Sequence, residues 1–235
     1  HGTFEEQEKI GELFESLDAC LEDQMAYVET LKKSKKAFLQ KLFPKKGTKV
    51  PELRFPGFEG DWEEKNLGDI GSIYSGLSGK TKEDFGKGNA KFIEFSNVLA
   101  NAVANEDMLG KTDIDEKQNT VKMGDILFNS SSETPEEVGM SSVWTHDIDN
   151  LYLNSFCIGF RPNIKLDNYF IAYLLRNGES RKQIVLLAQG ISRYNISRIG
   201  LTKIKILLPS LPEQEKIGSF FKALDEKIEK EEDKL

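Results

Sequence analysis

The sequence has few of the side chains that bind metals or form disulfide bonds. Its 235 residues include only two cysteines and two histidines. Cys20 and Cys157 lie far apart in the chain and in unlike surroundings, so no disulfide framework is expected. This cysteine usage is typical of an intracellular protein. With so few histidine and cysteine ligands, a zinc site is not expected either.

The sequence also lacks long hydrophobic runs. None reaches the roughly 18 residues that a membrane-spanning helix needs. Residues 1–9 are polar and acidic, which does not fit a signal peptide. Charged residues make up 30% of the chain and hydrophobic residues 38%, a composition typical of a soluble globular protein with a charge-rich helical part.

Motifs for catalysis and for nucleotide binding are absent. There is no Walker loop, no G-x-G-x-x-G after a strand and no G-x-S-x-G nucleophile elbow. The Asn/Asp-Pro-Pro-Tyr/Phe motif of adenine methyltransferases is missing too. The pair Glu63 and Lys65 matches a fragment of a nuclease pattern, but no Pro-Asp partner precedes it at a useful distance. We therefore expect a non-catalytic chain without a cofactor of its own, and keep a self-contained methyltransferase or nuclease as an alternative.

One long helix is predicted over residues 5–43. Its apolar residues recur in alternating steps of four and three, which is the heptad pattern of a coiled coil. This face, called the seam below, comprises Ile10, Phe14, Leu17, Leu21, Gln24, Val28, Leu31, Lys35, Phe38 and Leu42. A helix of this length needs a partner helix, and the polar Gln24 and Lys35 are expected to set register or partner.

The same helix type occurs a second time near the end of the chain. The sequence E-Q-E-K-I-G at residues 6–11 recurs at residues 213–218, and Phe, Leu and Asp follow at matching positions in both copies. The repeat predicts a second seam helix from about residue 210. Its seam residues are Ile217, Phe221, Leu224 and Ile228.

Between the two helices, residues 51–209 are predicted to form a mixed, mostly β domain. A proline- and glycine-rich connector, 50–58, leads into it. Strands are expected within 73–80, 91–95, 124–129, 138–143, 152–162 and 204–208, and helices at 169–176 and 179–188. The predicted fold is α+β, with a helix in 1–50, the mostly β domain in 51–209, and the start of the second helix in 210–235.

The distribution of charge favours nucleic acid although the net charge is −7. Residues 51–149 carry nine basic and twenty acidic side chains, a charge of −11. Residues 150–209 carry nine basic and two acidic side chains, a charge of +7. Because a duplex contacts one face rather than the whole protein, the basic segment is a candidate DNA surface.

Candidate DNA contacts lie in loops and on two helices of this domain. Arginine can bind guanine with two hydrogen bonds, asparagine can bind adenine, and serine suits phosphate oxygens. The candidates are Ser192, Arg193, Tyr194, Asn195, Arg198, Ser130, Ser131, Lys80, Arg181 and Lys182. Three alternatives stay open. Asn195 and Ser197 could cap the next turn, and Arg176, Arg181 and Lys182 could form a solvated helix face. Lys203 and Lys205 could bind phosphate or simply be exposed.

Several of these segments together resemble a known family. They are R-F-P-G-F-x-G-x-W at 54–62, G-D-I-L-F at 124–128, G-x-S-x-x-N-I-S at 190–197, I-x-I-x-x-P-x-L at 204–211 and P-E-Q-x-K-I at 212–217. In their order and spacing they resemble the specificity subunit of type I restriction–modification systems, where a target recognition domain runs into a conserved spacer helix.

The resemblance implies a DNA-reading subunit of the bacterial cytoplasm. Such subunits carry two recognition domains, each reading half of a bipartite site, on paired helices. A methyltransferase subunit supplies S-adenosylmethionine and catalysis, and a restriction subunit brings ATP-driven, Mg-dependent cleavage. This sequence holds only one such domain, so we expect either half a subunit or a fragment of a two-domain subunit. For half a subunit, the hypothesis is that two copies form a homodimer through the helices. A coiled-coil adaptor that binds no DNA is the remaining alternative.

Overall fold

The protein was analysed as a computed structural model that describes residues 2–235. The chain divides into two compact units. One is a helical unit that comprises the residues up to Phe38 together with Phe220–Leu235. The other is a mixed unit that comprises Leu39–Ser219. No helix in the described chain has both the length and the apolar character needed to cross a bilayer.

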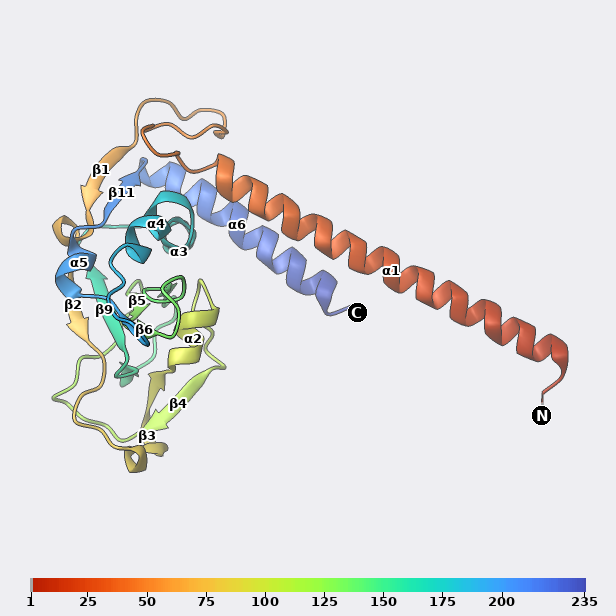
Figure 1. Cartoon of the computed structure of the whole chain (residues 1–235), viewed down its shortest axis with the longest axis horizontal. Helices are drawn as coiled ribbons and strands as arrows, with labels where there is room; N and C mark the ends of the chain where they lie inside the picture. The colour runs from red at the N-terminus through yellow and green to blue at the C-terminus, as the bar shows by residue number, and fades with distance from the viewer. Residues whose placement is uncertain (1) are drawn as a thin grey trace. The chain divides into compact units, whose positions relative to one another are not determined.

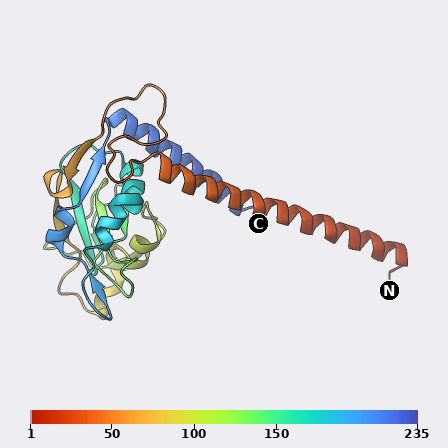
Figure 2. The ribbon, with the colours of Figure 1, turned by 45° about the horizontal axis from the view of Figure 1, so that its top comes forward.

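The helical unit is an antiparallel pair. Helix α1 spans Phe4–Lys41, close to the predicted 5–43, and α6 spans Leu211–Glu232. From Phe220 onward α6 lies alongside the C-terminal half of α1, as both views show (Figures 1 and 2). The rings of Phe38 and Phe220 meet edge to face with centroids 5.0 Å apart. Val28 and Ile228 are buried, so the second helix copy supplies the partner that the heptad pattern required.

Both polar residues of the seam are bonded to α6. Gln24 Nε2 donates to the carbonyl oxygen of Glu231 at 2.8 Å and to its carboxylate at 3.0 Å. Lys35 forms an ion pair with Asp225. A polar group inside an apolar seam favours the one alignment in which it is satisfied. These contacts therefore fix the register of α1 against α6, as the sequence predicted.

The N-terminal half of the seam is not covered. Ile10, Phe14, Leu17 and Leu21 are all exposed, with Phe14 at 60%. In contrast, Leu31, Phe38 and Leu224 are half-buried, and Leu42, Ile217 and Phe221 are buried. The heptad pattern is thus continuous in the sequence, while its burial in this chain begins only near Gln24.

The mixed unit is built from short strands in four small sheets. The strands are β1 Glu63–Asn66, β2 Gly71–Ser75, β3 Phe85–Ile93, β4 Leu109–Thr112, β5 Ile126–Asn129, β6 Ser131–Ser132, β7 Ser141–Val143, β8 Leu151–Leu153, β9 Cys157–Pro162, β10 Tyr194–Asn195 and β11 Lys205–Leu208. The central sheet has the order β2-β9-β5-β7 and is antiparallel throughout. A second sheet, β4-β3-β8, pairs β3 with β8 in parallel. The remaining pairs are β1 with β11 and β10 with β6.

Short helices lie between the strands, and two of them contact the central sheet. They are α2 Phe95–Ala100, α3 Asn168–Arg176, α4 Gly178–Val185 and α5 Arg198–Thr202, with 3₁₀ turns η1 Leu67–Asp69 and η2 Lys82–Asp84. Both α2 and α3 contact the strand β7, and α3 also packs on α4. Trp62, Phe43 and Phe170 form an aromatic cluster with ring centroids 5.6 to 6.3 Å apart. Trp62 is buried in this cluster, so it is a packing residue.

A buried ion pair joins the connector to the start of α6. Arg54 donates from Nε and Nη2 to the two carboxylate oxygens of Glu213, both at 2.8 Å. The Glu213 side chain is only 2% exposed. The same guanidinium also donates to the carbonyl oxygens of Glu59 and Gly60. The connector is therefore folded around one arginine, and the carboxylate raises the pKa of that arginine.

Removing the carboxylate from this pair should destabilise the mixed unit. In Glu213→Ala the Arg54 charge stays largely buried without its counter-ion, which costs about 3 kcal/mol. The measurement is the free energy of unfolding from urea denaturation. Glu64→Ala is the matched control, since Glu64 and Lys205 form an exposed pair worth under about 1 kcal/mol. Equal losses in the two variants would contradict the structural role of Arg54 and Glu213.

Candidate nucleic-acid interface

The predicted DNA-contacting loop is a short, tightly closed segment. Gln189 and Asn195 exchange main-chain hydrogen bonds of 2.8 and 2.9 Å, which close the loop at its base. Gly190 has a φ of +141°, and a side chain there would collide with the carbonyl oxygen of Arg193. Only glycine fits this backbone position. The loop thus presents Ile191, Ser192 and Arg193, all exposed, in a fixed conformation.

The loop is paired with the serine segment that the sequence also indicated. Strand β10 pairs with β6, which places Tyr194 opposite Ser132 and Asn195 opposite Ser131. Arg193 Nε donates to Ser131 Oγ at 2.7 Å. Two segments about sixty residues apart in sequence, both selected as candidate DNA contacts, therefore come together in one place.

The serine hydroxyls themselves are used inside the protein. Ser130 Oγ donates to the carbonyl oxygen of Phe156 at 2.8 Å, and Ser131, which is 4% exposed, accepts from Arg193. Ser197 caps α5, because its hydroxyl accepts from Gly200 N at 2.9 Å. The internal-cap alternative therefore holds for Ser197. Asn195 is exposed and its amide reaches only the Arg193 carbonyl, at 3.4 Å.

The structure gives the helix arginines an internal role. Arg176 donates to the carbonyl oxygens of Val98, Leu99, Ala100 and Ser141 and so caps the end of α2. Burial, together with the charge of Arg181, lowers the pKa of Arg176 to about 10. Arg181 donates to the carbonyl oxygens of Glu136 and Val138, and burial lowers its pKa as well. Arg181, predicted as a DNA contact, therefore anchors a loop through Nη2, while its Nη1 is buried without a hydrogen-bond partner among the described residues.

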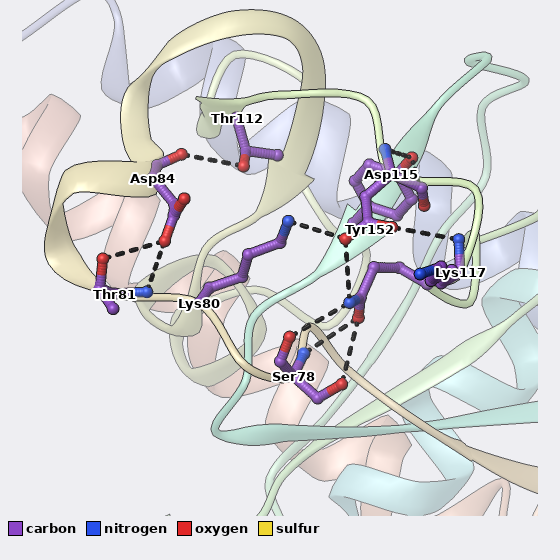
Figure 3. Close-up of polar contacts among 9 residues, drawn as sticks. Ser78, Lys80, Thr81, Asp84, Thr112, Asp115, Lys117 and Tyr152 are labelled. Carbon is purple, nitrogen blue, oxygen red and sulfur yellow. Dashed lines mark hydrogen bonds and ion pairs between the residues drawn. The ribbon is translucent and has the colours of Figure 1, made fainter.

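The two candidate lysines are each paired with a carboxylate. Lys182 is exposed and pairs with Glu179 at 2.7 Å. Lys80 Nζ donates to Asp115 at 2.8 Å, and the Lys80 side chain is only 15% exposed. Figure 3 shows this lysine in a network of polar contacts with Asp115 and Ser78 nearby. Gln118 also donates to the Ser78 carbonyl oxygen and to the Asp115 carboxylate. Lys80 thus holds two loops together, and among the described residues it makes no hydrogen bond or ion pair with the 190–198 loop.

Few cations of the basic segment remain available. Of its nine basic residues, Arg161, Lys165, Lys182 and Lys205 pair with carboxylates, and Arg176 and Arg181 bond carbonyls. Within the part of the chain that the structure covers, Arg193, Arg198 and Lys203 have no acidic partner, and all three are exposed. The available positive charge is therefore concentrated in residues 193–203.

Lys203 and the aromatic Phe156 were not among the selected contacts. A sequence signal for Phe156 is its place in a polar turn between two apolar runs.

The chain thus contains an α+β unit and, within it, a closed loop that presents an exposed arginine. Among the described residues, no three His, Cys, Asp or Glu side chains are grouped as a metal ion would require. Residues 59–235 match the family described as the type I restriction modification DNA specificity domain. Because this match covers most of the chain, the protein belongs to that family.

Individual relatives agree with this assignment. The chain is 29% identical over 242 residues to the type I restriction enzyme MjaVIII specificity subunit of Methanocaldococcus jannaschii. The alignment covers 96% of this chain and 54% of the relative. A putative MjaX specificity subunit of the same organism is 30% identical and is covered over 52% of its length. The chain therefore spans about half the length of these curated relatives.

A solved structure shows the same fold. The HsdS subunit from Thermoanaerobacter tengcongensis superposes with a TM-score of 0.63 at 19% sequence identity. The superposition covers 95% of this chain and 50% of that one. The predicted α+β architecture with flanking helices and the family resemblance are thereby confirmed.

The Lys80–Asp115 contact predicts a low carboxyl pKa. Lys80 and the Lys117 N–H, both donating to the Asp115 carboxylate, lower the Asp115 pKa to about 2. An unfolded aspartate titrates near pH ~4, so the contact stabilises the fold above that pH and is lost as pH falls towards about 2. A ¹³C NMR titration of the Asp115 carboxyl should show this midpoint. Lys80→Met should raise it, while Lys82→Met, at an exposed lysine, should not; an unchanged midpoint in the first variant would refute the pairing.

Proposed function

We propose that this protein is the DNA-recognition part of a type I restriction–modification complex and reads one half of a bipartite site. Family membership supports a role in DNA specificity. The observation that carries the proposal is that three exposed cations, Arg193, Arg198 and Lys203, have no acidic partner among the described residues. Cations that no carboxylate neutralises are available to displace counterions from a phosphate backbone.

The chemistry of the complex would reside on other chains. A methyltransferase subunit would carry S-adenosylmethionine, and a restriction subunit would use ATP and Mg, so this chain would be non-catalytic. Support comes from the relatives, which are named as specificity subunits of restriction enzymes. We place this complex in the bacterial cytoplasm, where its DNA substrate is found.

The exposed half of the α1 seam supports a second contact, with another copy of this chain. Ile10, Phe14, Leu17 and Leu21 form one apolar stripe at heptad spacing, and exposed stripes of this kind mark protein interfaces. Two copies joined in antiparallel fashion along this stripe would cover it. A two-fold dimer would then carry two recognition domains and read a palindromic split site.

DNA binding should depend on salt through the unpaired cations. The plot of log affinity for a mixed-sequence duplex against log salt concentration should be linear, with a slope that Arg198→Ala plus Lys203→Ala reduces by roughly two. Fluorescence anisotropy over a salt series measures it. The matched control, Lys165→Ala plus Lys182→Ala, removes the same charge from ion pairs and should leave the slope nearly unchanged. A chain that binds no duplex at any salt concentration would instead support the coiled-coil adaptor.

The mass in solution tests the second-copy contact. Light scattering across a dilution series should give about twice the chain mass of 26.6 kDa. Phe14→Glu with Leu17→Glu should yield monomers, because burying the charges in the stripe is unfavourable. Ser16→Glu lies on the same helix outside the seam and should leave the dimer intact. A wild-type protein that stays monomeric at every concentration would refute the dimer but not the DNA-reading role.

A further inference from the structure

Arg193 is held in place on two sides. Its Nε donates to Ser131 Oγ at 2.7 Å. Its guanidinium carbon also lies 5.8 Å from the centre of the Phe156 ring. A long side chain on a surface loop ordinarily samples many rotamers, and ordering it costs entropy. The two contacts supply that ordering before any ligand arrives.

The two supports are themselves fixed. Ser131 is buried in β6 and paired with β10. The carbonyl oxygen of Phe156 accepts from Ser130 N at 2.9 Å and from Ser130 Oγ at 2.8 Å, and Phe156 N donates to Asn154 Oδ1 at 2.9 Å. Phe156 is nevertheless 56% exposed, so its ring faces outward beside Arg193. The arginine therefore rests on a rigid turn and a rigid strand pair.

The contacts leave one edge of the guanidinium available. Neither Nη1 nor Nη2 of Arg193 bonds a partner within residues 2–235, and no carboxylate there pairs with it. These two nitrogens form a planar fork that matches a carboxylate, a phosphate or the O6 and N7 atoms of guanine. Arg198 and Lys203, the two other exposed cations without an acidic partner in the described chain, follow Arg193 closely in sequence and favour a polyanion over a free carboxylate.

A base edge fits this arrangement better than a phosphate. A phosphate contact needs positive charge near the backbone, which Arg198 and Lys203 already provide without any ordering contacts in the described chain. A guanine edge requires in addition that the fork lie in a defined plane. Among the three exposed cations without an acidic partner in the described chain, only Arg193 has both its Nε bonded and its guanidinium face against a ring.

We infer that Arg193 recognises one guanine in the major groove, with Nη1 and Nη2 donating to O6 and N7, and that Ser131 and Phe156 are the residues that position it. This inference rests on the proposed DNA-reading function. It names the base that the loop selects and assigns Phe156 a role in specificity.

The test is selection of bound duplexes from a randomised pool, followed by anisotropy with the selected duplex. Wild-type protein should enrich a site with an invariant guanine, and 7-deazaguanine at that position should weaken binding by roughly 10- to 100-fold. Arg193→Lys keeps the charge but loses the fork. It should bind mixed duplex with an unchanged salt slope, enrich no guanine there, and be insensitive to 7-deazaguanine.

The positioning residues are tested by graded variants. Phe156→Leu and Ser131→Ala should lower the preference for guanine while affinity for mixed duplex stays the same. Phe156→Tyr, which keeps the ring, should retain the preference. Far-ultraviolet circular dichroism and the melting temperature verify that each variant is folded.

The outcomes separate this inference from the function on which it rests. Salt-dependent wild-type binding without an invariant guanine, or an Arg193→Lys profile equal to wild type, would overturn the guanine assignment and leave DNA binding intact. Uniform weakening across all sequences in Arg193→Ala, with a salt slope smaller by roughly one, would assign Arg193 to a phosphate instead. Absence of any duplex binding by the wild type would overturn both.

Discussion

The mixed unit depends on the ion pair between Arg54 and Glu213. A carboxylate that is almost fully buried is stable only with a charged partner and further hydrogen bonds, and Arg54 supplies both by binding the carboxylate and two connector carbonyls. The neighbouring Gln214 extends this joint by accepting from Asp167 N and donating to the Pro209 carbonyl. The P-E-Q segment that carried part of the family resemblance is therefore a structural joint. The exposed cations of residues 193–203 and then β11 come directly before this joint in the chain. The joint therefore holds the C-terminal end of the segment that carries the candidate interface.

The internal repeat shows how environment, rather than sequence, decides what a motif does. Ile217 and Phe221 are buried, whereas their counterparts Ile10 and Phe14 are exposed by 53% and 60%. Gly218 leaves no room for a side chain against the Asp167 carboxylate, whereas the matching Gly11 has open space around it. One pattern of residues thus produces a filled contact surface in one place and a free one in the other. The heptad period predicts both helices, but burial depends on what lies opposite, which the repeat itself does not encode.

Much of the fold could be predicted because its signals are local. The helix period predicted α1 and α6 to within a few residues. Apolar runs next to turn residues located β2, β5 and β9, and a β-branched run located β11. The sequence did not reveal α2, because Phe95 continues the alternation of β3 before the chain turns into a helix. It also did not reveal β1 and β4, whose residues are mostly polar or small and become strands only through pairing with β11 and β3. Serines 131 and 132 were read as loop for the same reason, since their strand exists only against β10.

The candidate site was predictable in position but not in the role of each residue. The basic segment and the 190–198 loop were found from charge and composition. These properties describe a segment as a whole and do not show which contact each residue makes. Arg176 and Arg181 contribute to that sum, yet their guanidinium groups bond carbonyls of residues 35 to 78 positions away, a pairing that no local pattern encodes. Guanidinium N–H groups that donate to main-chain carbonyl oxygens cannot donate to a ligand at the same time. The interface is thus smaller than the charge of the segment suggests. It is also better defined, since the three cations that remain have no acidic partner in the described chain, and one of them, Arg193, is already ordered by Ser131 and Phe156.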